Sequence, residues 1–336
     1  MSDKPAGLLA RLRIDTYLLL IVGMVVAASL LPARGAAAPV FGWTTKIAIG
    51  LVFFLHGARL SREAVIGGLT HWRLHLVVLT STYLLFPLLC LGLAALPAWI
   101  TPPALATGIV FVGCLPSTIQ SSIAFTSIAR GNVAAALCAA TASNLLGILL
   151  TPLLAGLLLS AHGGFSAVGI GDVAVQLLLP FVAGQLARPW IGGWVARNRH
   201  LTGLVDRGSI LVVVYVAFSE GVTHGIWHQL SPRSFAALLL LDVVLLIAVL
   251  LATTCIGRLL GFNRADQITV TFCGSKKSLA SGLPMASVLF AGPSLGLAVL
   301  PLMLFHQVQL MVCAALARRY GAAFQAATTQ PAVVAA

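Results

Sequence analysis

Long apolar runs separated by short polar stretches dominate the chain. Crossing the hydrocarbon of a bilayer takes about 20 apolar residues, and ten runs approach or exceed that length. We expect helices near residues 14–33, 44–61, 73–96, 103–128, 132–160, 173–190, 208–229, 234–260, 267–290 and 294–317. The first run follows basic residues, as in a signal peptide, but its length favours a retained helix. The sequence therefore predicts an all-α polytopic membrane protein with ten transmembrane helices.

Composition supports a membrane protein. Hydrophobic residues make up 59% of the chain and charged residues 8%, with a mean hydropathy of +1.02. The formal net charge of +12 could indicate a nucleic-acid partner, but the basic residues lie between apolar runs and are not interleaved with aromatic residues. We therefore expect the lipid bilayer as a partner and no nucleic acid. The pattern leaves the oligomeric state open.

The basic residues divide unequally between the two sides of the expected spans. Of the twenty Lys and Arg residues, fifteen fall on the side of both termini and three on the other, which leaves only Lys276 and Lys277 inside a span. Cytoplasmic loops accumulate Lys and Arg. We therefore expect both termini in the cytoplasm.

The stretch from Ala161 to Asp172 separates five runs from the next five. An odd number of spans in each half gives the halves opposite orientations, as in an inverted repeat. We expect a first five-helix repeat at 14–160 and a second, inverted one at 172–320.

The fourth run of each half contains a polar interruption, which predicts a broken helix. Pro116 removes a backbone donor in one run, and Gly274 loosens the other. Broken helices in both halves indicate a binding site in mid-membrane of a secondary transporter. The polar residues of these interruptions and of the following run are the candidate substrate and cation ligands: Thr118, Gln120, Ser121, Ser122, Thr141, Asn144, Ser275, Lys276, Lys277 and Ser278.

These segments resemble the bile acid:sodium symporter superfamily, solute carrier family 10, and most of all its bacterial branch. The most specific matches are GCLPSTIQSSIAFTSIARGN (113–132), TASNLLGILLTPLL (141–154) and FCGSKKSLASGLPM (272–285). The resemblance implies two inverted repeats that form a panel and a core domain, with discontinuous helices 4 and 9 crossing beside the cation and substrate sites. It implies a symporter that moves a small organic anion across a bacterial inner membrane, with no cofactor and with Na⁺ as a candidate coupling ion.

The resemblance also assigns cation ligands. A family Ser-Asn pair after the fourth-span break falls on Ser121 and Ser122, the candidate sodium ligands, and a third-span glutamine falls on Thr82. Fifth-span hydroxyls fall near two alanines, with three polar residues as displaced substitutes: Ala136 and Ala140, then Thr141, Ser143 and Asn144.

The ninth span departs from the family pattern. The family places a cation-binding glutamate where Phe272 stands and a glutamine where Lys276 stands. No acidic residue follows Asp266. Sodium coupling is therefore in question.

Two adjacent lysines in a lipid-compatible segment cost several kcal/mol unless water, protein or an anion receives them. One hypothesis puts the Lys276 ammonium in the place of a cation, ligated by oxygens of Thr118, Gln120, Ser121, Ser122 and Asn144. Its protonation cycle could then replace sodium coupling. A lysine could instead bind an anionic substrate directly, or the lysines could form static ion pairs with Glu220 or Asp242.

For several other polar residues the sequence allows two hypotheses, a role in the binding site or a structural one. The hydroxyls after Pro116 could be interhelical hydrogen-bonding groups rather than ligands. Glu220, beside His224 and His228, could be a solvated residue at the end of its span. Three side chains of the tenth run could line the cavity or bond between helices: His306, Gln307 and Gln309.

The leading function is thus a secondary active transporter. The chain has no GxxxxGK[ST] motif for ATP and no HExxH zinc motif, and we expect no enzyme. Alternatives are a sodium-independent or proton-coupled carrier in which Lys276 replaces the cation, and a regulatory membrane protein that does not transport.

Overall fold

The computed structural model describes residues 16–35, 37–59, 71–160, 170–223, 225, 231–290 and 294–329. All regular elements within these ranges are helices, the form in which a single segment satisfies its own backbone in lipid. In chain order they are α2 (Thr16–Leu30), α3 (Ala37–Arg59), α5 (Trp72–Thr80), the π-helix η1 (Ser81–Leu85), α6 (Phe86–Ala94), α7 (Pro103–Cys114), α8 (Ile119–Ile128), α9 (Val133–Ser160), α10 (Ile170–Arg197), α11 (Arg199–Thr223), α13 (Pro232–Leu259), α14 (Arg264–Gly274), α15 (Leu279–Leu289) and α16 (Ser294–Thr329).

Six described stretches are long and apolar enough to cross a membrane: α3, the continuous α5–η1–α6, α9, α11, α13 and α16. The bent pair α7 and α8 would make a seventh. The described part of α2 is shorter, and α10 and the pair α14 and α15 are not among these stretches. The protein is therefore a helical, multi-pass membrane protein, while ten spans and an inverted repeat remain predictions.

Helices occupy each of the ten expected ranges, but several continue beyond the apolar run. α3 begins at Ala37 rather than near 44, α11 at Arg199 rather than near 208, and α16 reaches Thr329 rather than 317. An apolar run marks where lipid covers a helix, whereas backbone hydrogen bonding continues into the polar interface. Parts of the expectations lie outside the described residues: 14–15, 60–61, 161–169, and 224 and 226–229 with both histidines beside Glu220.

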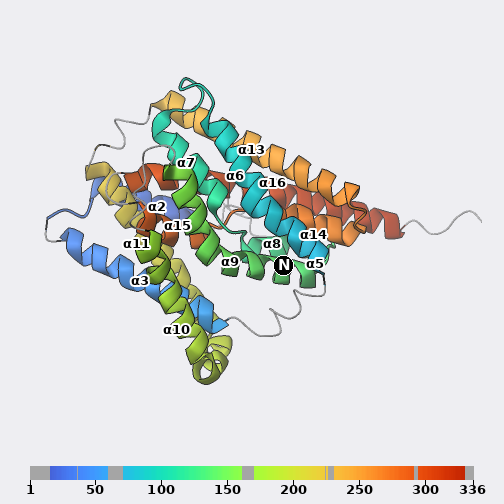
Figure 1. The fold of residues 1–336 in the computed structure, drawn as a ribbon, viewed down its shortest axis with the longest axis horizontal. Helices are drawn as coiled ribbons and strands as arrows, with labels where there is room; N and C mark the ends of the chain where they lie inside the picture. The colour runs from blue at the N-terminus through green and yellow to red at the C-terminus, as the bar shows by residue number, and fades with distance from the viewer. Residues whose placement is uncertain are drawn as a thin grey trace, which may run out of the picture.

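Helices α2, α3, α10 and α11 pack together on one side of the molecule (Figure 1). The closest pair is α3 and α10. A Cβ atom added at Gly57 would overlap the carbonyl oxygen of Phe181, and one added at Gly184 would overlap that of Phe54. Glycine thus allows the two backbones to touch, as small residues do between membrane helices.

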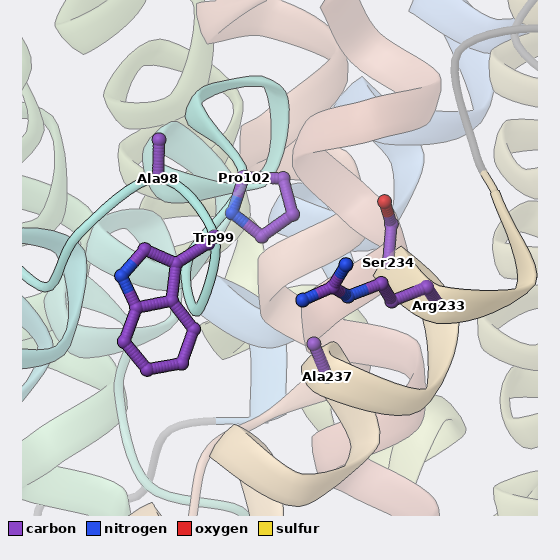
Figure 2. A pocket seen from close by; sticks show the side chains of 6 residues that line it. All are labelled: Ala98, Trp99, Pro102, Arg233, Ser234 and Ala237. Atoms are coloured by element: carbon purple, nitrogen blue, oxygen red, sulfur yellow. The ribbon is translucent and has the colours of Figure 1, made fainter.

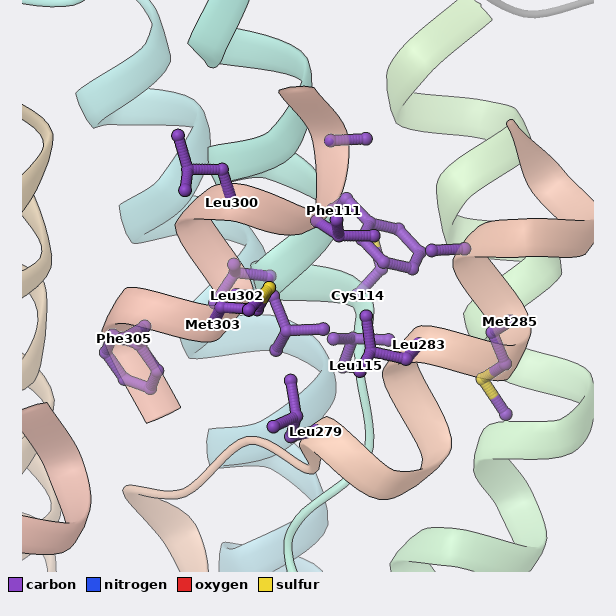
Figure 3. Packing of buried hydrophobic residues seen from close by; sticks show 14 of the residues in the cluster. Phe111, Cys114, Leu115, Leu279, Leu283, Met285, Leu300, Leu302, Met303 and Phe305 are labelled. Atoms are coloured by element: carbon purple, nitrogen blue, oxygen red, sulfur yellow. The ribbon is translucent and has the colours of Figure 1, made fainter. Parts of the chain in front are cut away.

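The main apolar core joins α7, α15 and α16 (Figure 3). Leu115, just past the end of α7, packs toward Leu283 of α15. A Cβ at Gly282 would lie 2.6 Å from the side chains of both Leu115 and Leu302. This core surrounds the end of α7, where the first break begins, and the start of α15, where the second break ends.

A shallow cavity of about 240 Å³ lies between the α6–α7 connection and the first turn of α13 (Figure 2). Its lining includes the exposed residues Trp99 and Arg233, a pairing typical of the membrane interface. The cavity lies at the opposite end of α7 from the break, so it is separate from the predicted site.

Candidate functional site

Both predicted interruptions are present. α7 ends at Cys114, the chain is extended at Leu115 (φ −78°, ψ 155°), and α8 begins at Ile119 after a bend of 66°. Leu115 precedes a proline, which disfavours helical backbone there. α14 ends at Gly274, and α15 begins at Leu279, where Ser278 caps the helix by accepting a hydrogen bond from the Ser281 amide.

The two breaks cross and hydrogen bond to each other. The Ser278 amide donates to the Pro116 carbonyl at 2.9 Å. The Ser117 hydroxyl donates to the Cys273 carbonyl at 2.7 Å, and the Thr118 hydroxyl to the Lys277 carbonyl at 2.9 Å. Carbonyls freed at the helix ends thus find donors in the opposite break, as an interrupted helix within a membrane requires.

Lys277 is fully buried, and its ammonium group lies inside a cage of carbonyl oxygens. The Nζ atom donates to Thr82 O at 2.8 Å, Gly113 O at 2.7 Å and Leu115 O at 2.7 Å. The same atom lies 4.2 Å from the centre of the Phe86 ring, whose face attracts cations. An ammonium has three donors, and all three are used here. Lys277 therefore joins α7 to the π-helix η1.

The Thr82 carbonyl is available because of the local sequence. The amide of Phe86 bonds to Ser81 O, as in a π-helix, so the next amide along should bond to Thr82 O. That next residue is Pro87, which has no N–H. The Thr82 hydroxyl is occupied within its own helix by Val78 O, so Thr82 contributes its backbone rather than its side chain.

Lys276 has different surroundings from its neighbour. Its side chain is also fully buried, but no oxygen or nitrogen atom accepts a hydrogen bond from Nζ, whose polar neighbours are the thiols of Cys313 and Cys273. It lies 3.9 Å above the ring of Phe125 and 5.7 Å from that of Phe272. The expectation that Lys276 meets oxygens of Thr118, Gln120, Ser121, Ser122 and Asn144 is therefore wrong, because the side chain leaves the break toward an aromatic face.

The expected static ion pairs are also not what the lysines form. The three donors of Lys277 meet carbonyls rather than carboxylates. Among the described residues, no ion pair joins either lysine to Asp242. The buried charges are thus met by dipoles and aromatic faces.

Polar residues of α8 and α9 hold the crossing in place. Asn144 donates to Ser117 O at 2.6 Å and accepts from the Ser281 hydroxyl at 2.7 Å. Ser143 accepts from the Ser117 amide, and Ser122 donates to Phe272 O at 3.4 Å. These residues thus act as interhelical hydrogen-bonding groups in this conformation.

The remaining candidates differ in exposure and contacts. The hydroxyls of Ser121 and Ser275 are buried without a hydrogen-bond partner. Gln120 is exposed and Thr141 is half-buried, so neither is drawn into the hydrogen bonds of the crossing.

Gln309 of α16 contacts the second break directly. Its side-chain oxygen accepts from the Lys277 amide at 2.9 Å, and its Nε2 donates to the Lys277 carbonyl at 2.8 Å. His306, one turn earlier, lies with Nδ1 3.3 Å from the same carbonyl. Gln309 therefore forms hydrogen bonds between helices, the second of the two hypotheses for this residue. The role of Ser281 was not foreseen, although its position three residues after the capping Ser278 is a recognisable signal.

Two broken helices that cross in the interior of a multi-pass helical protein are typical of membrane carriers. The chain belongs to the SBF-like CPA transporter family, whose profile matches residues 15–322. It is 53% identical over 312 residues to the putative symporter YfeH of Escherichia coli, covering 91% of this chain and 93% of that protein. It is 30% identical over 323 residues to sodium/bile acid cotransporter 7 of Rattus norvegicus, covering 91% and 92%. The resemblance to the bile acid:sodium symporter superfamily is confirmed, and the chain is a transporter-family protein rather than an enzyme.

Proposed function

We propose that the protein is a secondary active transporter that moves a small organic anion across the bacterial inner membrane by alternating access, without sodium at the helix crossing. The observation that carries this proposal is the Lys277 ammonium held by three backbone carbonyls at 2.7–2.8 Å. Carbonyl cages of this kind bind monovalent metal cations in membrane proteins. Here a covalently attached cation fills the cage, so a free ion is not needed there.

The surroundings of Ser121 and Ser122 support the same conclusion. Ser122 donates to the carbonyl of Phe272, and the ring of Phe272 packs between Phe125 and Tyr320. An aromatic side chain thus stands where the family resemblance implies a carboxylate. The Lys276 ammonium lies over Phe125, one helical turn from Ser121, and a fixed positive charge disfavours a second cation nearby.

Lys276 is the best candidate to attract the transported anion. A buried ammonium without an acceptor is costly, and an anion would provide that acceptor. The unpartnered Ser275 hydroxyl adjoins Lys276 in the chain, and the unpartnered Ser121 hydroxyl shares a helix face with Phe125. Two hydroxyls and one ammonium suit a carboxylate or sulfate group.

The wider architecture also supports a carrier. We retain the two inverted repeats, 14–160 and 172–320, as part of the proposal, because each contributes one broken helix to the crossing. The group α2, α3, α10 and α11 packs on the remaining helices mainly through α11 with α15 and α16, and α10 with α9. Movement of this group against the others would open the crossing to each side in turn, with both termini in the cytoplasm.

Uptake into proteoliposomes tests the proposal. The purified chain is assayed with radiolabelled taurocholate, steroid sulfates and small carboxylates, with Na⁺ on both sides or replaced by choline. We expect at least one anion to accumulate equally with and without Na⁺. Lys276→Met should abolish its uptake, whereas Arg233→Gln, which removes a charge far from the crossing, should retain it.

Two results would contradict the proposal. Uptake that requires Na⁺ would show that the carrier binds sodium. Failure of every anion with folded protein would favour the regulatory, non-transporting role.

A further inference from the structure

Asp242 is an acidic residue within the membrane-spanning part of the chain. It lies ten residues after Pro232 on the 28-residue helix α13, which places it about 15 Å from the helix start. Its side chain is 2% exposed, and its Oδ2 atom is buried without a hydrogen-bond partner. No described residue forms an ion pair with it.

Another buried acid in the same chain provides a contrast. Asp266 is 4% exposed, yet its Oδ1 accepts from Asn132 at 2.9 Å and its Oδ2 from Asn263 at 2.8 Å. Both oxygens of that carboxylate have donors, and Asp266 also sits in the first turn of α14, where negative charge is stabilised. Asp266 is therefore held as a carboxylate by its surroundings. Asp242 has neither the two side-chain donors nor a position in the first turn of a helix.

An ionised carboxylate without a partner is unstable in a low-dielectric interior, so this environment favours the neutral acid over the carboxylate. Acidic residues inside membrane spans that face the protein interior commonly belong to proton pathways. We propose that Asp242 is a proton-binding site, which carries a proton with the anion and releases it when the carrier opens to the other side. This inference rests on the proposed transport function.

Among the described residues, the charged and titratable groups on the helices that pack against α13 do not pair with Asp242. α13 packs against α14, α16, α6 and η1. The charged and titratable residues of these elements and of the break after α14 are Arg264, Asp266, Cys273, Lys276, Lys277, His306, Cys313, Arg318, Arg319, Tyr320, Cys90 and Tyr83. Cys90 lies within electrostatic range of both Asp242 and Lys277. Lys277 has no donor left for a carboxylate, because three carbonyls occupy its ammonium.

The helix face that carries Asp242 leads to the crossing. Val249 and Thr253 lie on that face, at positions separated from Asp242 by whole helical turns, and both are fully buried. The Thr253 methyl group would lie 3.1 Å from a Cβ atom at Gly274, the residue at which α14 breaks. A change at the break therefore alters the surface against which this face of α13 is packed.

The proton balance is simple. The neutral carboxyl group ionises to a carboxylate and a proton, and the proton passes to water on the side to which the carrier has opened. One proton moved with a monovalent anion gives no net charge transfer, so the membrane potential does not oppose uptake of the anion.

Carbodiimide labelling tests the protonation of Asp242 without a substrate. Dicyclohexylcarbodiimide adds to neutral carboxyl groups in apolar surroundings, and mass spectrometry of the digested full chain locates the adduct. We expect labelling of Asp242 but not of Asp266 near neutral pH. The rate should fall about tenfold per pH unit once the acid ionises. Equal labelling of the two residues, or labelling of Asp242 that ignores pH, would overturn the proposal.

Thermal unfolding of the purified full chain gives a second readout. A folded state that holds a proton which the unfolded chain releases loses stability as pH rises. Asp242→Asn resembles the neutral acid in shape and should fold, but its unfolding temperature should change less between pH 6 and 9 than that of the wild type (about one proton's slope). Asp242→Glu should restore the slope. Identical slopes for wild type and Asp242→Asn would reject the proton site, whether or not any anion is transported.

Discussion

Lys276 and Lys277 are neighbours in the chain and are equally buried, yet their ammonium groups meet different partners. Lys277 donates to three carbonyls, and Lys276 rests on the face of Phe125 without an oxygen acceptor. The free energy lost on removing each charge should differ accordingly, because one removal strands buried acceptors and the other does not.

Substitution by methionine, which is apolar and of similar length, separates the two lysines. Lys277→Met leaves three carbonyls unpaired, and each costs about 1–3 kcal/mol, so we expect a large drop in unfolding temperature. Lys276→Met strands no buried acceptor and removes an ammonium that has no oxygen acceptor, so it should not lower the unfolding temperature. Thermal unfolding in detergent measures both. Equal losses would contradict the assigned partners.

The sequence places both lysines in a membrane segment, but it does not reveal which one meets oxygen atoms. Their side chains leave a non-helical stretch, so their directions depend on backbone angles that no periodicity specifies. The carbonyl of Thr82 could have been anticipated, because the residue five positions later is Pro87. The sequence shows that Pro87 has no N–H. It does not show the π-helix, whose hydrogen-bonding pattern pairs residue 87 with the Thr82 carbonyl.

Among the helices, the breaks in α7–α8 and α14–α15 are the features most directly encoded. Pro116 and Gly274 mark them, and each break appears at that position. Hydropathy does not show how closely two helices approach, so the contact between α3 and α10 at Gly57 and Gly184 was not predicted. That contact depends on the matching positions of two glycines far apart in the chain.

Alanine substitutions test the α3–α10 contact. Gly57→Ala or Gly184→Ala would force a methyl group into a backbone carbonyl of the opposite helix, and overpacking of this kind costs about 1–3 kcal/mol. Gly50→Ala, on the same helix as Gly57, meets only an ordinary contact of 3.9 Å with Pro180 and serves as the control. We expect lower unfolding temperatures for the first two variants alone, and the contact is misassigned if the control falls equally.

For the protein as a whole, hydropathy predicts the class correctly and gives the expected number of spans, while their orientation rests on the distribution of Lys and Arg. Arg34 and Arg233 are exposed on the expected outer side, and Arg199 is exposed at the start of α11 on the expected cytoplasmic side. Loop charge has a physical link to orientation, so accessibility from one side of the membrane is the property that checks it.

Cysteine labelling in spheroplasts tests the orientation. A membrane-impermeant maleimide should modify Arg233→Cys in intact spheroplasts, and Arg199→Cys only after permeabilisation, relative to the wild-type chain with its own cysteines. Labelling of both variants from outside would require a different number of spans between positions 199 and 233.

The amide side chain of Gln309 pairs with Lys277 as a neighbouring β-strand would, accepting from its N–H and donating to its C=O. Such pairing recognises the peptide unit and not the side chain attached to it. These two hydrogen bonds tie the second break to α16 whatever side chain stands at position 277. A change of the side chain at position 277 consequently leaves this backbone pairing intact, even though it empties the carbonyl cage.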